Sequence, residues 1–71
     1  MMDLKIALNA ISKKDYNTTF KILSPLAENK NPSALFYLGY FYHLGLGVTA
    51  NKLEAERLRS NAIKIIKIND L

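Results

Sequence analysis

The sequence predicts an all-α protein made of two stacked antiparallel helix hairpins. First, apolar residues recur at the i, i+3, i+4, i+7 spacing of helices with one buried stripe. Second, short stretches of turn and cap residues join these segments, so consecutive helices are expected to pair antiparallel. Third, the segment 34–48, ALFYLGYFYHLGLGV, is apolar nearly all round and ends in closely spaced glycines. Helices are expected over about 2–12, 15–29, 32–44 and 51–67.

The first hairpin is predicted from two amphipathic stripes and a short turn. The stripe of the segment 2–12 consists of Leu4, Ala7, Leu8 and Ile11. After the turn, Asp15 is placed to cap the next helix by accepting from the free N–H groups of its first turn. That helix carries the stripe Tyr16, Phe20, Leu23 and Ala27. Pro25 removes one backbone donor inside it, so we expect a kink or a short 3₁₀ irregularity there without a break.

The second hairpin begins with Asn31 as cap and Pro32 at the first helical position, which is a frequent start signal. Gly39 lies inside the helix that follows. A glycine there costs about 1 kcal/mol relative to alanine, so it indicates that another backbone comes close. Gly45 is expected in the left-handed conformation that ends a helix. Because this helix is apolar nearly all round, we expect it to be buried from two directions.

The last helix is expected to start at Asn51, and Glu54 gives the spacing of a capping box. Its buried stripe is expected to consist of Ala55, Leu58, Ala62, Ile65 and Ile66. The other face carries charged side chains, as is typical of the solvated end of a helical array.

One set of residues in the second hairpin resembles a known repeat family. The set has fixed spacings across both helices and consists of Ala34, Leu38, Gly39, Tyr42, Gly45, Gly47, Val48, Asn51, Ala55 and Ala62. It looks like one repeat of the Sel-one-like repeat (SLR) family, which is related to the tetratricopeptide repeats. The segment from Asp15 to Ala34 is similar to the stretch that leads into the first such repeat in bacterial members. The resemblance therefore covers about residues 15–63.

The resemblance implies one domain, 1–71, with 1–30 as a degenerate leading hairpin and 31–67 as one typical repeat. It also favours a bacterial source. About three repeats are normally needed for a self-sufficient stack. A surface that would meet a third repeat should therefore stay open. The chain departs from the family pattern without threatening the fold at Thr49, Asn51, Leu58 and Ile63.

Composition excludes several classes of protein. The chain has 71 residues, is 49% hydrophobic, contains no Cys and has a formal net charge of +4. These values fit one small globular domain without disulfides or thiolate metal sites. A single core of this size rarely supplies more than about 3–5 kcal/mol, so a partner or oligomerisation is expected to supplement it. No apolar run is long enough to span a bilayer, and no secretion signal is evident, so a cytoplasmic location without membrane association is expected.

The candidate protein-binding residues lie in the helix 32–44 and the turn after it. They are Tyr37, Tyr40, His43, Leu44 and Leu46, at positions that are typically polar or variable in the repeat family. One interpretation is that the apolar members belong to a buried core helix. The other is that they form an exposed contact patch, because a tyrosine ring supplies apolar area while its hydroxyl stays hydrated.

Other polar residues give weaker indications. His43 has no partnered nucleophile or spaced carboxylates, so a surface or helix-end role is favoured over catalysis. Basic side chains could contact phosphates, but Glu54 and Glu56 accompany them on the last helix. A solvated face of mixed charge is therefore favoured over a nucleic-acid site.

These observations predict a non-enzymatic interaction module or small adaptor of helical-repeat type. Its partner is expected to be another protein, with a second copy of the chain as one candidate. The alternative is a small inhibitor or immunity-type protein that docks on a partner enzyme and blocks it. A nucleic-acid or acidic-surface binder is disfavoured. No two reactive side chains share a motif, so no catalytic residue, cofactor or metal is expected.

Overall fold

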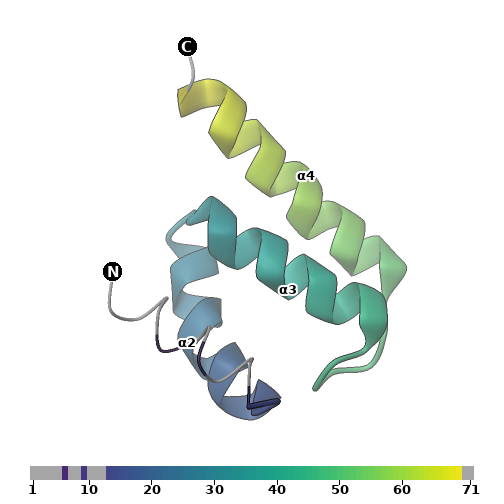
Figure 1. Ribbon diagram of the computed structural model, residues 1–71. Coiled ribbons are helices and arrows are strands. Elements are labelled where there is room, and N and C mark those ends of the chain that lie inside the picture. Colours follow the sequence, from purple (N-terminus) through teal and green to yellow (C-terminus); the bar gives the residue numbers. More distant parts are fainter. Residues whose placement is uncertain (1–5, 7–8, 10–12, 70–71) are drawn as a thin grey trace.

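The structure is a computed structural model that describes Ile6, Asn9 and residues 13–69, the side chain of Asn69 excepted. Within these residues the chain is all-helical and contains no strand. Its helices are α2 (Tyr16–Glu28), α3 (Pro32–Leu44) and α4 (Lys52–Asn69), as shown in Figure 1.

The expected helices 15–29, 32–44 and 51–67 are confirmed, with small differences at their ends. The helix expected over 2–12 lies largely outside the described residues, although Ile6 and Asn9 are both helical.

The central helix α3 packs against α2 on one side and against α4 on another (Figure 1). This confirms the expectation that α3 is buried from two directions. The core that the three helices enclose consists of Leu23, Ala34, Leu35, Leu38, Phe41, Leu58 and Ala62.

Aromatic rings join α2 to α3. Phe41 is 1% exposed, and its ring centroid lies 5.6 Å from that of Tyr16 and 5.5 Å from that of Phe20. A third pair, Phe20 with Tyr42, has centroids 6.0 Å apart and an interplanar angle of 85°. Edge-to-face and tilted pairs of this kind add to the burial of apolar area. They anchor the first half of α2 on the second half of α3.

Asp15 begins α2 as predicted. Its carboxylate accepts from the Thr18 N–H at 3.2 Å and from the Thr18 hydroxyl at 2.7 Å. The fully buried Thr19 hydroxyl donates to the Asp15 carbonyl at 2.8 Å, so it carries no unpaired polar group into the core. The helix then continues past Pro25 without a break, as expected. The 3₁₀ irregularity that was an alternative to a kink is not found, because the segment is α-helical throughout.

The end of α2 is a Schellman motif built on Lys30, which has a positive φ of 64°. The Lys30 N–H donates to the Ala27 carbonyl at 3.0 Å, and the Asn31 N–H donates to the Leu26 carbonyl at 3.0 Å. These two bonds satisfy carbonyls that have no partner within the helix. Asn31 then caps α3, because its side chain accepts from the Ala34 N–H at 3.2 Å.

Two glycines end α3 and direct the loop back to α2. Gly45 has a φ of 72°, and its N–H donates to the Phe41 carbonyl at 2.7 Å, which confirms the left-handed helix end. Gly47 also has a φ of 72°. A Cβ atom at Gly47 would lie 2.6 Å from the Cβ of Tyr16, closer than real Cβ atoms approach. The loop can therefore contact the start of α2 only because residue 47 has no side chain.

Gly39 brings α3 and α4 together. A Cβ atom at this position would lie 3.2 Å from the Ala55 carbonyl oxygen and 3.4 Å from Cγ of Arg59. The expectation that another backbone comes close to Gly39 is thus confirmed. Buried alanines lie on both helices of this pair, at Ala34 on α3 and Ala55 and Ala62 on α4.

The capping box expected at the start of α4 is only half formed. The Asn51 side chain accepts from the Glu54 N–H at 3.1 Å, as predicted. However, the Asn51 N–H donates to the Tyr42 carbonyl at 2.8 Å, and the Glu54 carboxylate binds Arg57 instead. The reciprocal bond is missing because the backbone of the α3–α4 connection already satisfies Asn51.

Candidate functional site

A row of large apolar side chains on α3 faces solvent. It consists of Phe36, Tyr40 and Leu44, which follow one another at i, i+4 and i+8 and therefore form one ridge along the helix. Tyr40 is 56% exposed and Leu44 is 50% exposed. The row stays uncovered because α2 packs on another side of α3, where it contacts Phe41.

Three exposed side chains also share one side of α4. Arg59, Ile63 and Ile66 are spaced i, i+4 and i+7, so they share one side of the helix. Arg59 borders the same hollow as Phe36 and Tyr40, which places this side of α4 beside the α3 row. Ile63 and Ile66 are both exposed. The assignment of Ile66 to the buried stripe of α4 was therefore wrong, whereas Ala55, Leu58 and Ala62 are buried and Ile65 packs against the core.

These two rows define a surface that we call the open face: Phe36, Tyr40 and Leu44 of α3, with Ile63 and Ile66 of α4. Single exposed apolar residues are ordinary on protein surfaces, but a contiguous group indicates a contact site. Phe36 and Tyr40 of α3 border one hollow together with Arg59 of α4, so two helices contribute to the open face.

The open face also contains two hollows. Phe36 and Tyr40 border a hollow of about 240 Å³ shared with Gly39, Arg59 and other residues of α3 and α4. The same two side chains border a second, wider hollow of about 450 Å³ with Ser33 and Tyr37. The aromatic ridge of α3 therefore stands between two depressions.

Charges of both signs lie at the edge of the open face. Glu56 borders the smaller hollow together with Arg59. Their side chains are 72% and 60% exposed, and the Arg59 nitrogen lies 4.0 Å from the Glu56 oxygen. An exposed pair at this distance contributes little to stability. Both side chains can therefore turn to other partners.

The predicted interaction residues divide into two groups. Tyr40, His43 and Leu44 are exposed, and Tyr40 and His43 both border the smaller hollow. Tyr37 and Leu46 are half-buried and pack against the core. For Leu46 the reason is the left-handed turn at Gly45, which folds the chain back so that the Leu46 N–H bonds the Phe41 carbonyl at 2.9 Å.

Sequence reasoning missed three members of the open face, Phe36, Ile63 and Ile66. The i, i+4 spacing of Phe36 and Tyr40 was a usable signal. No comparable signal marked Ile63 and Ile66, since which side of α4 meets α3 depends on the packing of the two helices.

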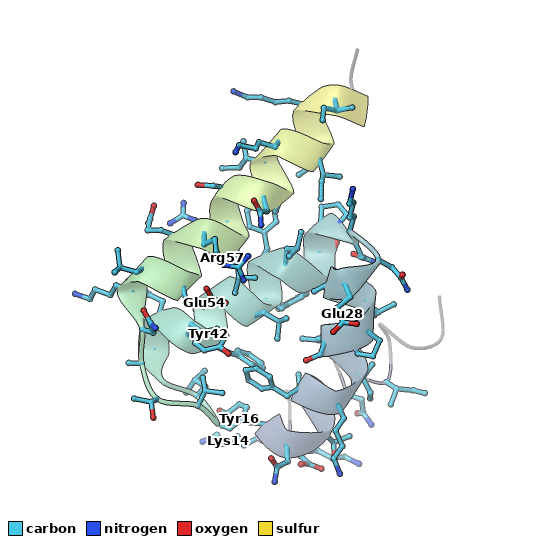
Figure 2. All side chains as sticks on the ribbon, turned by 180° about the vertical axis from the view of Figure 1, so that it is seen from behind. Lys14, Tyr16, Glu28, Tyr42, Glu54 and Arg57 are labelled. Carbon is cyan, nitrogen blue, oxygen red and sulfur yellow. The ribbon has the colours of Figure 1, made fainter. Side chains whose placement is uncertain are left out.

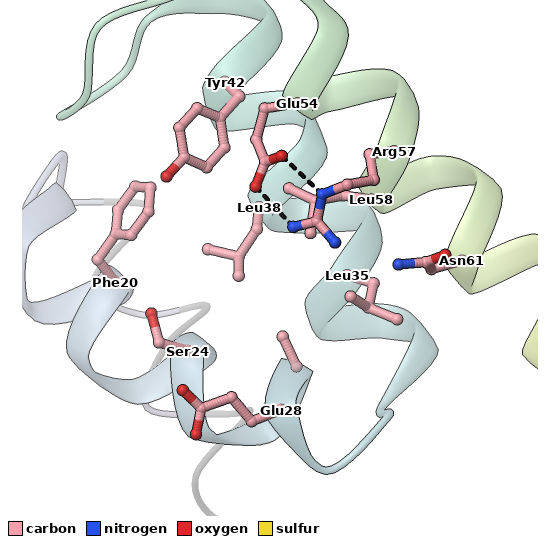
Figure 3. A pocket seen from close by; sticks show the side chains of 11 residues that line it. Phe20, Ser24, Glu28, Leu35, Leu38, Tyr42, Glu54, Arg57, Leu58 and Asn61 are labelled. Carbon is pink, nitrogen blue, oxygen red and sulfur yellow. Dashed lines mark hydrogen bonds and ion pairs between the residues drawn. The ribbon is translucent and has the colours of Figure 1, made fainter. Parts of the chain in front are cut away.

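A third hollow lies on the other side of α3, between α2 and α4. Figure 3 shows this groove, which has a volume of about 400 Å³. Its apolar lining includes Phe20, Leu35, Leu38 and Leu58, and its polar lining includes Ser24, Glu28, Tyr42, Glu54, Arg57 and Asn61.

The strongest ion pair of the described residues borders this groove. Arg57 donates to both oxygens of Glu54, at 2.7 and 2.6 Å, from one turn further along α4. Figure 2 shows the pair beside Tyr42, with Glu28 across the groove on α2. The hydrogen bonds from Arg57 lower the pKa of Glu54, and those to Glu54 raise the pKa of Arg57. Each group thus keeps the other charged, which is the opposite of what a proton-transferring acid or base needs.

Comparison with known proteins finds no matching family, no matching curated protein and no matching solved structure. Within the described part of the chain, no helix combines the length and apolar character that crossing a bilayer requires. In the same part, no three His, Cys, Asp or Glu side chains are grouped as they would be around a metal ion.

Proposed function

We propose that this protein is a non-catalytic interaction module that binds another protein through the open face. The observation that carries the proposal is the exposed ridge of Phe36, Tyr40 and Leu44 beside Ile63 and Ile66. Aromatic side chains next to hollows are typical anchors of protein interfaces, because a few such residues supply most of the binding free energy.

The module is proposed to be of helical-repeat type, with residues 31–67 as one SLR-like repeat and 1–30 as a degenerate hairpin before it. Support comes from the close approach at Gly39 and the left-handed Gly45 and Gly47. In repeat proteins each hairpin buries its outer surface against the next one. Among the described residues no further hairpin packs on 31–67, and the open face fits such an outer surface.

The proposal includes no cofactor and no reaction. The closest pair of ionisable groups in the groove, Glu54 and Arg57, hold each other in their charged states. That arrangement suits a structural ion pair on the surface of α4.

A comparison of two point variants tests the proposed function. Tyr40→Glu places a charge on the open face, whereas Leu53→Glu places the same charge on α4 at a residue that is 84% exposed and outside the face. A protein partner should bind the wild type and the Leu53→Glu variant and lose most of its affinity for Tyr40→Glu. Crosslinks from the bound partner should fall on α3 and α4. Equal binding by both variants contradicts the proposal.

A further inference from the structure

We propose that the partner on the open face is a second copy of this chain, related to the first by a two-fold axis. This inference rests on the proposed interaction function and names its partner. In a two-fold dimer the same patch of each copy meets itself, so the patch must be complementary to itself in both shape and charge.

The shape of the open face meets this requirement. It carries protruding apolar side chains, such as Tyr40 and Ile63, and also the hollows of about 240 and 450 Å³ that flank the aromatic ridge. A patch made only of protrusions, or only of hollows, would fit a partner of different shape. Here each copy offers side chains to insert and space to receive them.

The charges at the edge of the open face also allow the patch to be complementary to itself. The chain as a whole carries a formal charge of +4, and a purely basic edge would repel its own copy. The edge of the open face instead includes an acidic residue, Glu56, with Arg59 three residues after it and Lys52 four residues before it, all exposed. Two-fold pairing allows Glu56 of each copy to meet Arg59 of the other. The 4.0 Å contact within one copy is loose enough to be exchanged for this pairing.

The small core gives a physical reason for association. The sequence contains no Cys, so no disulfide supplements the core that α2, α3 and α4 enclose. Small domains of this kind commonly gain stability by oligomerisation. Pairing the open faces would bury Phe36, Tyr40 and Ile63, which the single chain leaves exposed.

The first test measures the molar mass of the full chain by analytical ultracentrifugation from micromolar to millimolar concentration. The wild type and the Leu53→Glu control should dimerise, and Tyr40→Glu and Ile63→Glu should weaken dimerisation at least about tenfold. All three substituted positions are exposed, so circular dichroism should show native helix content in every variant. A wild type that stays monomeric throughout, or dimerisation that is unaffected by both Tyr40→Glu and Ile63→Glu, overturns the inference.

The second test examines the two-fold pairing of charges. Glu56→Arg and Arg59→Glu should each dimerise more weakly than the wild type, because each places like charges opposite one another. When the two variants are mixed, every contact between them again joins opposite charges. Native mass spectrometry of an equal mixture at low salt should therefore show mixed dimer well above the twofold excess over each homodimer that random pairing gives. A mixture that stays as monomeric as its two components overturns this arrangement.

The two proposals fail in different ways. Suppose that the wild type is monomeric and that another protein binds it in a way that Tyr40→Glu weakens and Leu53→Glu does not. The proposed dimer is then rejected and the proposed interaction function is supported. If the wild type dimerises through the open face, both proposals are supported. If neither dimer nor Tyr40-dependent complex forms, both are rejected.

Discussion

At Lys30 and Lys14 the backbone takes positive φ angles of 64° and 60°, in the region that glycine occupies most easily. In Lys30 this conformation allows the two hydrogen bonds that end α2. Lysine thus occupies two positions at which the backbone conformation favours glycine. Gly45 and Gly47 show the opposite case, in which the same region of φ is taken by glycine.

Replacing Lys30 with glycine should stabilise the protein by about 0.5–1 kcal/mol, because it removes the clash of Cβ in the left-handed conformation. The matched control is Lys64→Gly, which makes the same change at an exposed position inside α4. Lys64→Gly should lower the free energy of unfolding by about 1 kcal/mol. Urea unfolding of both variants measures the difference, and two shifts of the same sign contradict the account of the α2 end.

Gly47→Ala should destabilise the protein by about 2 kcal/mol or more, since a left-handed alanine and an overpacked contact add together. Gly45→Ala is the control, because Gly45 has the same φ of 72° but its Cβ would lie 3.2 Å from its nearest neighbour, not 2.6 Å. Chemical unfolding should rank Gly47→Ala as the worse of the two. The reverse ranking would mean that the loop does not depend on its contact with Tyr16.

At the scale of the helix, the ends are specified by short-range hydrogen bonds and the sides by packing. Asp15 and Asn31 cap α2 and α3 through bonds to residues three positions ahead. Glu54 follows the same local rule only in part. Its N–H donates to the Asn51 side chain, but its carboxylate binds Arg57 one turn away, and the Asn51 N–H already donates to the Tyr42 carbonyl. Local patterns therefore predict that a helix begins, but not always which side chain each polar group binds.

The cap of α2 should make stability depend on pH. Hydrogen bonds from the Thr18 hydroxyl, and then from the Thr18 N–H, lower the pKa of Asp15 from its ordinary value of 3.8. A lowered pKa in the folded state stabilises the protein above 3.8, and this stabilisation is lost as the pH falls through the lowered value.

Asp15→Asn keeps a capping oxygen but does not titrate. Thermal unfolding followed from neutral pH into this acid range should therefore show a smaller loss of stability for Asp15→Asn than for the wild type. Thr18→Val, which lacks the hydroxyl donor to Asp15, should also lose less stability than the wild type as the pH falls. Identical acid dependence in all three proteins would remove Asp15 as the cause.

At the scale of the whole molecule, α3 is covered by α2 and α4 but retains an uncovered side, the open face. The groove between α2 and α4 is another concave surface, but the charged groups of Glu54 and Arg57 at its border already bind each other. The open face is therefore the surface on which association should act.

If a second copy covers that face, the melting temperature of the wild type should rise with protein concentration, because dimerisation stabilises only the folded chain. The melting temperature of Tyr40→Glu should change much less over the same range. Differential scanning fluorimetry at several concentrations measures both. A wild-type melting temperature that is independent of concentration would show that the folded chain gains nothing from its own copy.

Helices α2, α3 and α4, their caps at Asp15, Asn31 and Asn51, and the glycine turn were all predictable from the sequence. These features depend on contacts between residues close in the chain, and amino-acid spacing records such contacts directly. The close approach at Gly39 was predictable for a related reason, since a glycine inside a helix indicates that space is needed.

Only the tertiary structure decided which apolar side chains of α3 and α4 are covered. Tyr37 and Tyr40 are both tyrosines of one helix, yet the first packs against the core and the second is exposed. Ile65 and Ile66 divide in the same way on α4. On α3, which is apolar nearly all round, the spacing of residues does not identify the buried side, and on α4 the spacing assigned both Ile65 and Ile66 to it. The positions of the neighbouring helices decide it, and these follow from contacts between residues distant in the chain.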